Sequence, residues 1–127
     1  MRQKISSGSK WEDIVGYSRA VKVGNIIEVA GTTAMDGDTV VGRNDVYAQT
    51  LFILQKIELA LIQLGSSLND VVRTRMFVTN IANWQLVGNA HGEFFKTIKP
   101  VSSMIEVSSL INDDLLIEIE ATAIIEN

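Results

Sequence analysis

Hydrophobic positions between residues 51 and 64 recur every three or four residues, which is the spacing of an α-helix that buries one face. The residues that form this stripe are Leu51, Leu54, Ile57, Leu61 and Leu64. The helix is expected to begin after Asp45, whose short acidic side chain suits an N-cap, and to end at Gly65. Leu59 and Ile62 fall partly outside the stripe. The helix therefore either packs broadly on a sheet or uses part of its surface to contact another subunit.

Five shorter segments have the composition and alternation of β-strands. They are Ser18–Val23, Ile26–Ala30, Val71–Val78, Met104–Val107 and Leu115–Ile125. A second helix is expected from about Trp84 to Lys96 with Asn83 as its N-cap, and a turn at Met35–Asp38. The order β-β-α-β-α-β-β predicts an α+β fold, in which a mixed sheet carries both helices on one face. No linker or repeat divides the chain, so residues 1–127 are expected to form a single domain.

Alternating side chains divide each of the last three strands into two sets that face opposite sides of the sheet. The sets expected under the helices are mostly apolar: Val72, Thr74, Met76 and Val78; Ser103, Ile105 and Val107; and Leu115, Ile117, Ile119, Ala121 and Ala123. The opposite sets bring five charged residues to one face: Arg73, Arg75, Glu106, Glu118 and Glu120. The uncharged residues Ser102 and Met104 belong to the same set as Glu106. This face could carry solvated ion pairs, be covered partly by another copy of the protein, or line a pocket for a small polar ligand.

The composition is that of a folded globular chain, with 46% hydrophobic and 20% charged residues. The net charge of −4 argues against nucleic acid as a general partner, because phosphate neutralisation supplies most nonspecific affinity. The absence of Cys excludes disulfides, thiolate metal sites and a cysteine nucleophile, and a single His excludes a histidine-rich metal site. No metal or other cofactor is expected. No stretch has the pattern of a signal peptide or a membrane span, so a soluble cytoplasmic protein is the expectation.

Carboxylates are the most numerous groups that could transfer protons. Glu118 and Glu120 share one side of the last strand and could act as acid and base, orient a water molecule, or simply be surface residues. His91, in the second helix, is either a partly exposed helix residue or lies at the edge of a pocket. Tyr17 either packs or presents its phenol where a loop meets a strand. Gly31, at the end of a strand, permits a tight turn or the close approach of a ligand or another chain.

Five motifs follow one another along the chain: Gly16–Val21 (GYSRAV), Leu64–Thr74 (LGSSLNDVVRT), Phe77–Asn80 (FVTN), Glu93–Phe95 (EFF) and Ile117–Ala121 (IEIEA). In order and spacing, over nearly the whole chain, they resemble the Rid family, also called the YjgF or L-PSP family. The resemblance implies a fold like that of chorismate mutase. It also implies a homotrimer with ligand sites in the clefts between subunits.

The best-known activity in the Rid family is hydrolysis of reactive enamines and imines derived from amino acids. In such a site an Arg clamps the substrate carboxylate, and a Glu positions the attacking water. By position, Tyr17, Gly31 and Glu118 match site residues of the family. Ser102 occupies the place of the Arg, and Met104 that of a small residue two positions on. Because a serine has neither the charge nor the planar fork of a guanidinium, this departure argues against efficient hydrolysis of 2-iminobutanoate.

Two functions remain open on these grounds. One is a divergent hydrolase, deaminase-like, in which Arg75 or Arg19 supplies the missing cation for a small ligand with a carboxylate or carbonyl group. The other is a non-catalytic metabolite-binding or regulatory trimer that keeps the cleft without the chemistry. Ribonuclease activity or inhibition of translation, known for some relatives, fits poorly with the acidic charge and the single His.

Overall fold

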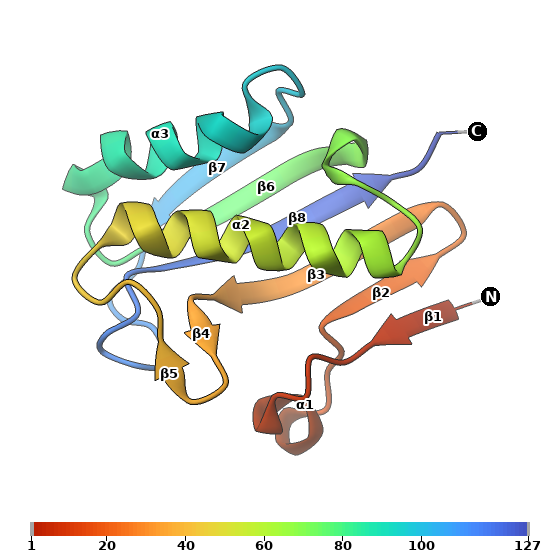
Figure 1. Ribbon diagram of the computed structural model, residues 1–127, viewed down its shortest axis with the longest axis horizontal. Helices are drawn as coiled ribbons and strands as arrows, with labels where there is room; N and C mark the ends of the chain where they lie inside the picture. Colours follow the sequence, from red (N-terminus) through yellow and green to blue (C-terminus); the bar gives the residue numbers. More distant parts are fainter. Residues whose placement is uncertain (1, 127) are drawn as a thin grey trace.

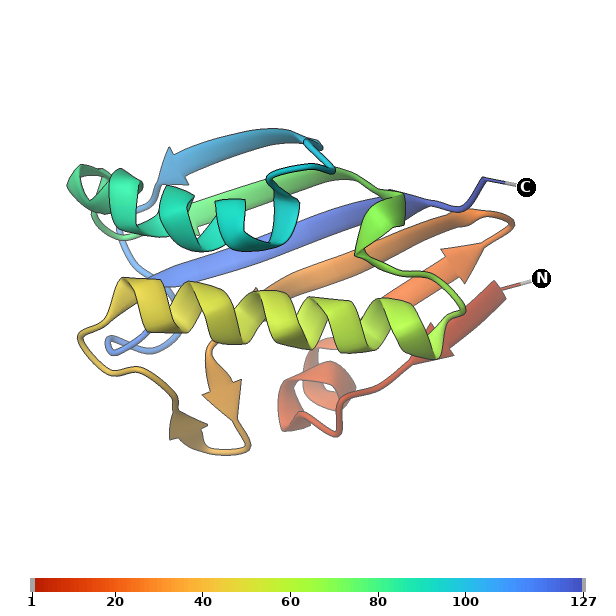
Figure 2. The same ribbon diagram turned by 45° about the horizontal axis from the view of Figure 1, so that its top comes forward.

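One mixed sheet and two long helices on the same face of it make up most of the structure, a computed structural model that describes residues 2–126. The strands lie in the order β1 (Arg2–Ile5), β2 (Ala20–Val23), β3 (Ile26–Thr33), β8 (Ile117–Ile124), β6 (Val71–Val78) and β7 (Val101–Glu106). Within this sheet only β6 and β7 run parallel; the other neighbouring pairs are antiparallel. Helices α2 (Val46–Gln63) and α3 (Trp84–Phe95) cover the same sheet face (Figure 1), and Figure 2 shows both of them in front of the sheet. The predicted α+β class and the placement of both helices are confirmed.

Helix α2 begins and ends where its sequence predicts. The Asp45 carboxylate accepts the backbone N–H of Ala48 at 3.0 Å, and Gly65 follows the helix with a φ of 80°, which favours glycine. The predicted stripe faces the sheet, where Leu54, Ile57 and Leu61 are at most 1% exposed. The helix therefore packs on the sheet through its stripe. Leu59 and Ile62 lie on its outer side and are 60% and 56% exposed.

The start of α3 differs from the prediction. Asn83 precedes the helix, but its side chain makes no capping hydrogen bond. A short 3-10 turn, η2 (Ile81–Asn83), leads into the helix, and it is Asn80 that accepts the N–H of Ala82 at 3.0 Å. The capping asparagine therefore serves the 3-10 turn, and α3 continues from that turn.

Strand β8 lies near the middle of the sheet and alternates as predicted. Ile117, Ile119, Ala121 and Ala123 are nearly fully buried under the helices, whereas Glu118 and Glu120 point to the opposite face. We call this opposite face, away from α2 and α3, the outer face. The strand is shorter than predicted at its start, although Leu115 is also buried.

The predicted faces of β6 and β7 were partly wrong. A register shift between Val71 and Arg73 buries Val71 and leaves Val72 41% exposed, because the extra residue reverses the alternation. In β7 the prediction was inverted throughout. The parallel register pairs Ser102, Met104 and Glu106 with residues of β6 that point toward the helices: Thr74, Met76 and Val78. Ser103 and Ile105 therefore face outward, and Ser102, Met104 and Glu106 do not belong to the charged outer face.

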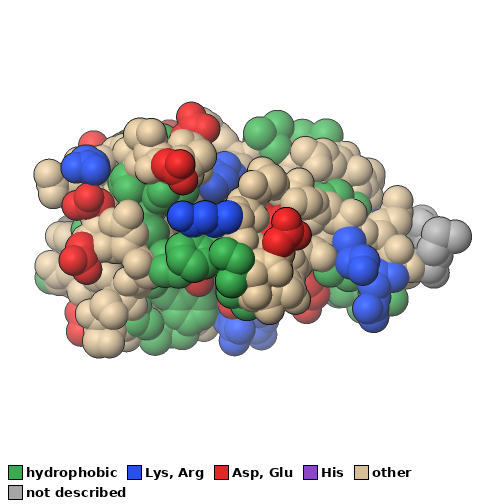
Figure 3. All heavy atoms as spheres, turned by 90° about the horizontal axis from the view of Figure 1, so that it is seen from below, with side chains coloured by type: hydrophobic (Ala, Val, Ile, Leu, Met, Phe, Trp, Pro, Cys, Tyr) green, Lys and Arg blue, Asp and Glu red, His purple; other side chains and the backbone are tan. Residues whose placement is uncertain are grey.

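The N-terminal region contains elements that were not predicted. Strand β1 pairs with β2 at one edge of the sheet, and a short helix, α1 (Lys10–Val15), connects the two. Helix α1 exposes Trp11, Ile14 and Val15, and Figure 3 shows hydrophobic side chains gathered on that side of the molecule, bordered by charged ones.

Other boundaries also differ. Strands β4 (Met35–Asp36) and β5 (Thr39–Val40) form a small hairpin around the predicted turn, and a 3-10 turn, η1 (Leu68–Asp70), precedes β6. Strand β2 is shorter than predicted at its start, β3 extends to Thr33, and β7 starts at Val101. Among residues 2–126, no helix is both long and apolar enough to cross a bilayer.

Candidate functional site

Glu118 lies over a bulge in the neighbouring strand β3. The register between β3 and β8 shifts between Val29 and Thr32, which sets Ala30 and Gly31 out of the regular ladder. A Cβ atom at residue 31 would lie 2.8 Å from Cδ of Glu118, closer than real Cβ atoms come to other atoms. The absence of a side chain at Gly31 is thus what lets the Glu118 carboxyl group occupy this position.

Arg19, which directly precedes β2, contacts the same bulge from the side of β3 opposite to β8. Its Nη1 donates to the backbone carbonyl of Gly31 at 3.0 Å and to Oγ1 of Thr32 at 2.9 Å. Its guanidinium also lies 5.8 Å from the ring centroid of Tyr17, within range of a cation–π contact. Tyr17, Arg19, Gly31 and Glu118 thus form one continuous group, which we call the Glu118 cluster.

The environment of Glu118 favours its protonated form. Burial raises the pKa of this carboxyl group, and the nearby charge of Glu120 raises it further, whereas Arg19 opposes the rise. A raised pKa is the direction of shift that suits a carboxyl group for exchanging a proton with a bound molecule.

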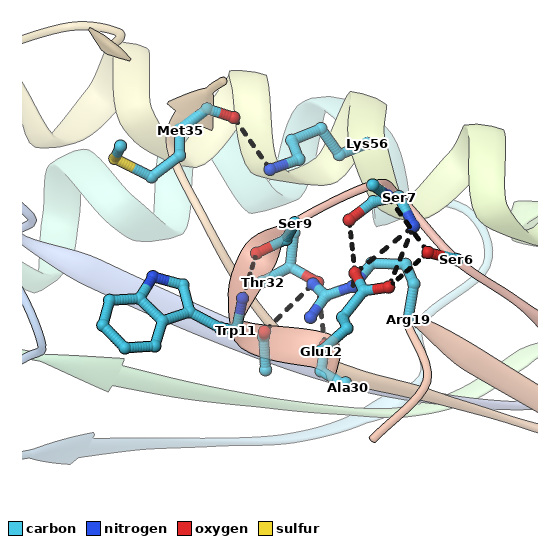
Figure 4. A network of polar contacts seen from close by, with 12 residues as sticks. Ser6, Ser7, Ser9, Trp11, Glu12, Arg19, Ala30, Thr32, Met35 and Lys56 are labelled. Atoms are coloured by element: carbon cyan, nitrogen blue, oxygen red, sulfur yellow. Dashed lines mark hydrogen bonds and ion pairs between the residues drawn. The ribbon is translucent and has the colours of Figure 1, made fainter. Parts of the chain in front are cut away.

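Arg19 is itself held by a buried carboxylate in α1 (Figure 4). Glu12 is only 4% exposed; its Oε2 lies 3.8 Å from Nε of Arg19, and it accepts hydrogen bonds from Ser6 and Ser7. Burial raises the pKa of Glu12, but the hydrogen bonds from Ser7 and Ser6 and the Arg19 charge outweigh it, so the pKa falls below its ordinary value. Close to this network, Lys56 donates to the backbone carbonyl groups of β3 and β4. The network fixes α1 and the bulge relative to each other.

Arg75 shares the outer face with Glu118, as predicted, but it is engaged elsewhere. Its Nε and Nη2 both donate to Oε1 of Glu120, at 2.9 and 2.7 Å. Both residues border a broad, open hollow on the outer face, together with Arg2, Lys4 and Arg73. The predicted charged face therefore exists for Arg73, Arg75, Glu118 and Glu120, and Arg75 has a carboxylate partner other than Glu118.

A second polar group lies under α3. The β6–β7 register places Thr74 beside Ser102, and the Thr74 hydroxyl donates to Oγ of Ser102 at 2.8 Å. Oγ1 of Thr74 also lies 2.9 Å from Nε2 of His91, whose ring stacks against Phe95. We call Ser102, Thr74 and His91 the Ser102 chain. Met104 lies one pair further along β7 and packs against the core.

The predicted site residues thus divide into two groups on opposite faces of one sheet. Tyr17, Gly31 and Glu118 belong to the Glu118 cluster on the outer side, and Arg75 lies on the same side but pairs with Glu120. The other predicted residues lie with the helices: His91, Ser102 and Met104. Sequence reasoning missed two residues, Glu12 and Thr74. Thr74 was assigned to the helix side, but its partners depend on the β6–β7 register. Among residues 2–126, no three His, Asp or Glu side chains are grouped so as to hold a metal ion.

We expect Gly31→Ala to displace Glu118 without unfolding the protein, because the colliding atoms are the flexible end of a side chain. Moved toward water, the Glu118 carboxyl group should titrate with a lower pKa, closer to its ordinary value, in a carbon-13 NMR titration. Gly92→Ala is the matched control, since a Cβ there would contact nothing within 4 Å. An unchanged Glu118 titration in Gly31→Ala would show that Gly31 does not determine the position of the carboxyl group.

Known proteins are similar to this chain in both sequence and fold. Residues 8–125 match the family described as endoribonuclease L-PSP. An uncharacterized protein of Streptomyces coelicolor is 35% identical, covering 95% of this chain and 90% of its own. The 3-aminoacrylate deaminase RutC of Acinetobacter baylyi is 32% identical, covering 84% of this chain and 85% of its own.

The crystal structure of Rv2704 from Mycobacterium tuberculosis, a member of the YjgF/YER057c/UK114 family, superimposes with a TM-score of 0.91. It is 49% identical, and the match covers 98% of this chain and all of the other. The YjgF protein of Escherichia coli, 28% identical, superimposes with a TM-score of 0.83 over 96% of this chain and 98% of its own. On the match of sequence and fold together, the chain belongs to the endoribonuclease L-PSP family, the Rid or YjgF family that its motifs resemble.

Proposed function

We propose that this protein hydrolyses a small enamine or imine and that Glu118 is the group that exchanges protons in the reaction. The observation that carries the proposal is the half-buried carboxyl group of Glu118, with a raised pKa, seated over the side-chain-free position Gly31. The name of a relative that is 32% identical, 3-aminoacrylate deaminase, supports the same class of reaction.

The chemistry requires one group that both takes and returns a proton. The substrate reacts as the protonated imine, and ionised Glu118 accepts a proton from water as the water oxygen adds to the C=N carbon; the C=N electron pair moves to nitrogen, which becomes a neutral amine. The protonated carboxyl group then gives its proton to this nitrogen, the C–N bond breaks as the C=O bond forms, and the hydroxyl proton leaves with the nitrogen, so the products are a carbonyl compound and ammonium. The raised pKa of Glu118 helps the second step, because it favours the protonated form of the carboxyl group that gives up the proton.

We further propose that the complete site is assembled between copies of the chain in a homotrimer. The Glu118 cluster and the Ser102 chain lie on opposite faces of one sheet, so the two cannot meet around one small ligand within a single copy. Edge strand β7 exposes Val101 and Ile105, which are 59% and 42% exposed and lie on the outer-face side. Another copy that covered these side chains would remove apolar surface from water.

The experiment is ammonia release from imines and enamines generated in place, from amino acids by an amino-acid oxidase or a lyase and from simple amines by an amine oxidase. The substrates should include 2-iminobutanoate and imines that lack a carboxylate. We expect the purified protein to accelerate ammonia release from at least one of them above the rate in buffer. No acceleration for any of these substrates would contradict the proposal.

A non-catalytic binding trimer is the second candidate, and the uncharged Ser102 chain favours it. Ser102 stands where the family resemblance implies a cationic clamp, and its neighbours Thr74 and His91 bring no fixed charge. For this function, thermal-shift screening against a metabolite panel should find a ligand that raises the unfolding temperature. The same ligand should be recovered chemically unchanged after incubation.

A further inference from the structure

The Ser102 chain runs from the buried side of the sheet to its exposed edge. Thr74 is fully buried between β7 and α3, whereas Ser102 lies on the edge strand and is exposed. The two hydroxyl groups and the imidazole are linked by contacts of 2.8 and 2.9 Å. A molecule that reaches the Ser102 hydroxyl therefore also meets, through Thr74, the ring of the single His in the chain.

The direction of these hydrogen bonds can reverse as a unit. If Nε2 of His91 carries the proton, it donates to Thr74, which donates to Ser102, and the Ser102 proton is free to point outward. If Nε2 is unprotonated, Thr74 donates to it, Ser102 donates to Thr74, and the lone pairs of Ser102 face outward. The Ser102 chain can thus offer a ligand either a hydrogen-bond donor or an acceptor, since each hydroxyl has one proton and two lone pairs.

No fixed charge belongs to this group. Burial lowers the pKa of His91, and no charged neighbour contributes to the shift, so the imidazole is neutral at pH 7. Arg75 is paired with Glu120, and Arg19 donates to the β3 bulge. A carboxylate placed against Ser102 would lose water with no cation from the Ser102 chain to compensate, which disfavours binding strongly.

We propose that the Ser102 chain binds an uncharged carbonyl, carboxamide or hydroxyl group and so selects neutral ligands over ligands that carry a carboxylate. This inference rests on the proposed function for the place of the ligand, but it concerns recognition and not hydrolysis. The Glu118 cluster of a neighbouring copy would also disfavour ligands that carry a carboxylate, because the ionised Glu118 carboxyl group repels a second carboxylate.

Two probes that contain no C=N bond test recognition apart from hydrolysis: 2-oxobutanamide and 2-oxobutanoate. We expect the wild type to bind the amide at least about tenfold more tightly in calorimetric titration, roughly the effect of one good hydrogen bond. Ser102→Ala should weaken amide binding by about tenfold, and Ser102→Arg should reverse the order of the two probes. Ser109→Ala, at an exposed serine in the loop after β7, is the matched control and should leave both affinities unchanged.

The NMR signals of the His91 ring separate ligand recognition from a purely structural role of the Ser102 chain, because a structural role would leave them unchanged when a ligand binds. Its nitrogen-15 signals are those of the single His and report which ring nitrogen carries the proton. We expect the amide to shift them in the wild type but not in Thr74→Val, which removes the connecting hydroxyl. Equal affinity for the two probes, preference for the carboxylate, no binding of either, or unchanged His91 signals would overturn the inference. Amide binding at Ser102 without hydrolysis of any imine would overturn the proposed function and leave this inference standing.

Discussion

Glu118→Gln is expected to slow imine hydrolysis by about 10²–10⁴-fold, the usual contribution of a general acid–base group. The amide has nearly the shape of the carboxylic acid and still fits over Gly31, but it cannot exchange a proton with water or with the leaving nitrogen. The loss should therefore appear mainly in kcat. The measurement is the steady-state rate of ammonia release by the wild type and the variant.

The same substitution is expected to raise the free energy of unfolding at pH 7. Because the folded state holds the proton of Glu118 more tightly than the unfolded chain, the unfolded chain ionises first as the pH rises. Stability is therefore lost as the pH rises from the ordinary carboxyl pKa, 4.5, toward the raised pKa of the folded state. Glu118→Gln removes this loss, so its unfolding free energy should change less over that range.

Glu28→Gln is the control for both measurements. Glu28 is an exposed carboxylate on the outer face of the adjacent strand β3, and it accepts a hydrogen bond from Thr122. Its neutralisation should leave the hydrolysis rate close to that of the wild type and should not raise the free energy of unfolding at pH 7. A Glu118→Gln variant with full activity would remove Glu118 from the mechanism, and one less stable than the wild type at pH 7 would contradict a raised pKa of Glu118 in the folded state.

Glu12→Ala is expected to lower the free energy of unfolding by about 3–5 kcal/mol, the range for breaking a buried ion pair from one side. The change leaves Arg19, whose side chain is 11% exposed, without its nearest carboxylate, and it leaves the Ser6 and Ser7 donors without their acceptor. The backbone carbonyl of Glu12 also accepts the N–H of Tyr17, so loosening α1 should disturb the Glu118 cluster.

Urea unfolding at pH 7 measures this effect, and Asp13→Ala provides the comparison. Asp13 is the next residue of α1, also acidic but exposed, and its loss should change stability by less than about 0.5 kcal/mol. If Glu12→Ala changed stability as little as Asp13→Ala, the buried network would not be what fixes α1 to the sheet.

The elements with strong apolar periodicity could be predicted from sequence. In α2 and β8 nearly every buried position follows the period of the element, so local pattern and tertiary packing agree. In β7 the pattern was weak, because Ser, Met and Ile alternate on an edge strand of which both faces are partly exposed. Its orientation depends on the parallel register with β6, which no local pattern encodes.

The candidate site was predictable only in part for the same reason. The family resemblance pointed to Glu118 and Gly31, and the structure brings them into close approach. The burial of Glu12 and the link from Thr74 to Ser102 and His91 join residues far apart in the chain. Such contacts follow from the fold. The N-terminal segment that carries Glu12 has no hydrophobic periodicity that would predict helix α1.

Complementation between two inactive variants tests whether one site is built from two copies of the chain. Glu118→Gln and Ser102→Trp, each inactive alone, are coexpressed with different tags, and assemblies that carry both tags are purified. Each site takes Glu118 from one copy and Ser102 from the next. In every mixed trimer, one of the three sites then has both residues intact, so we expect about one third of wild-type activity. A two-fold dimer would keep one of two sites and about one half of the activity. If the mixed assemblies were no more active than either variant alone, or if the wild-type protein were monomeric in solution, the site would not be shared between copies.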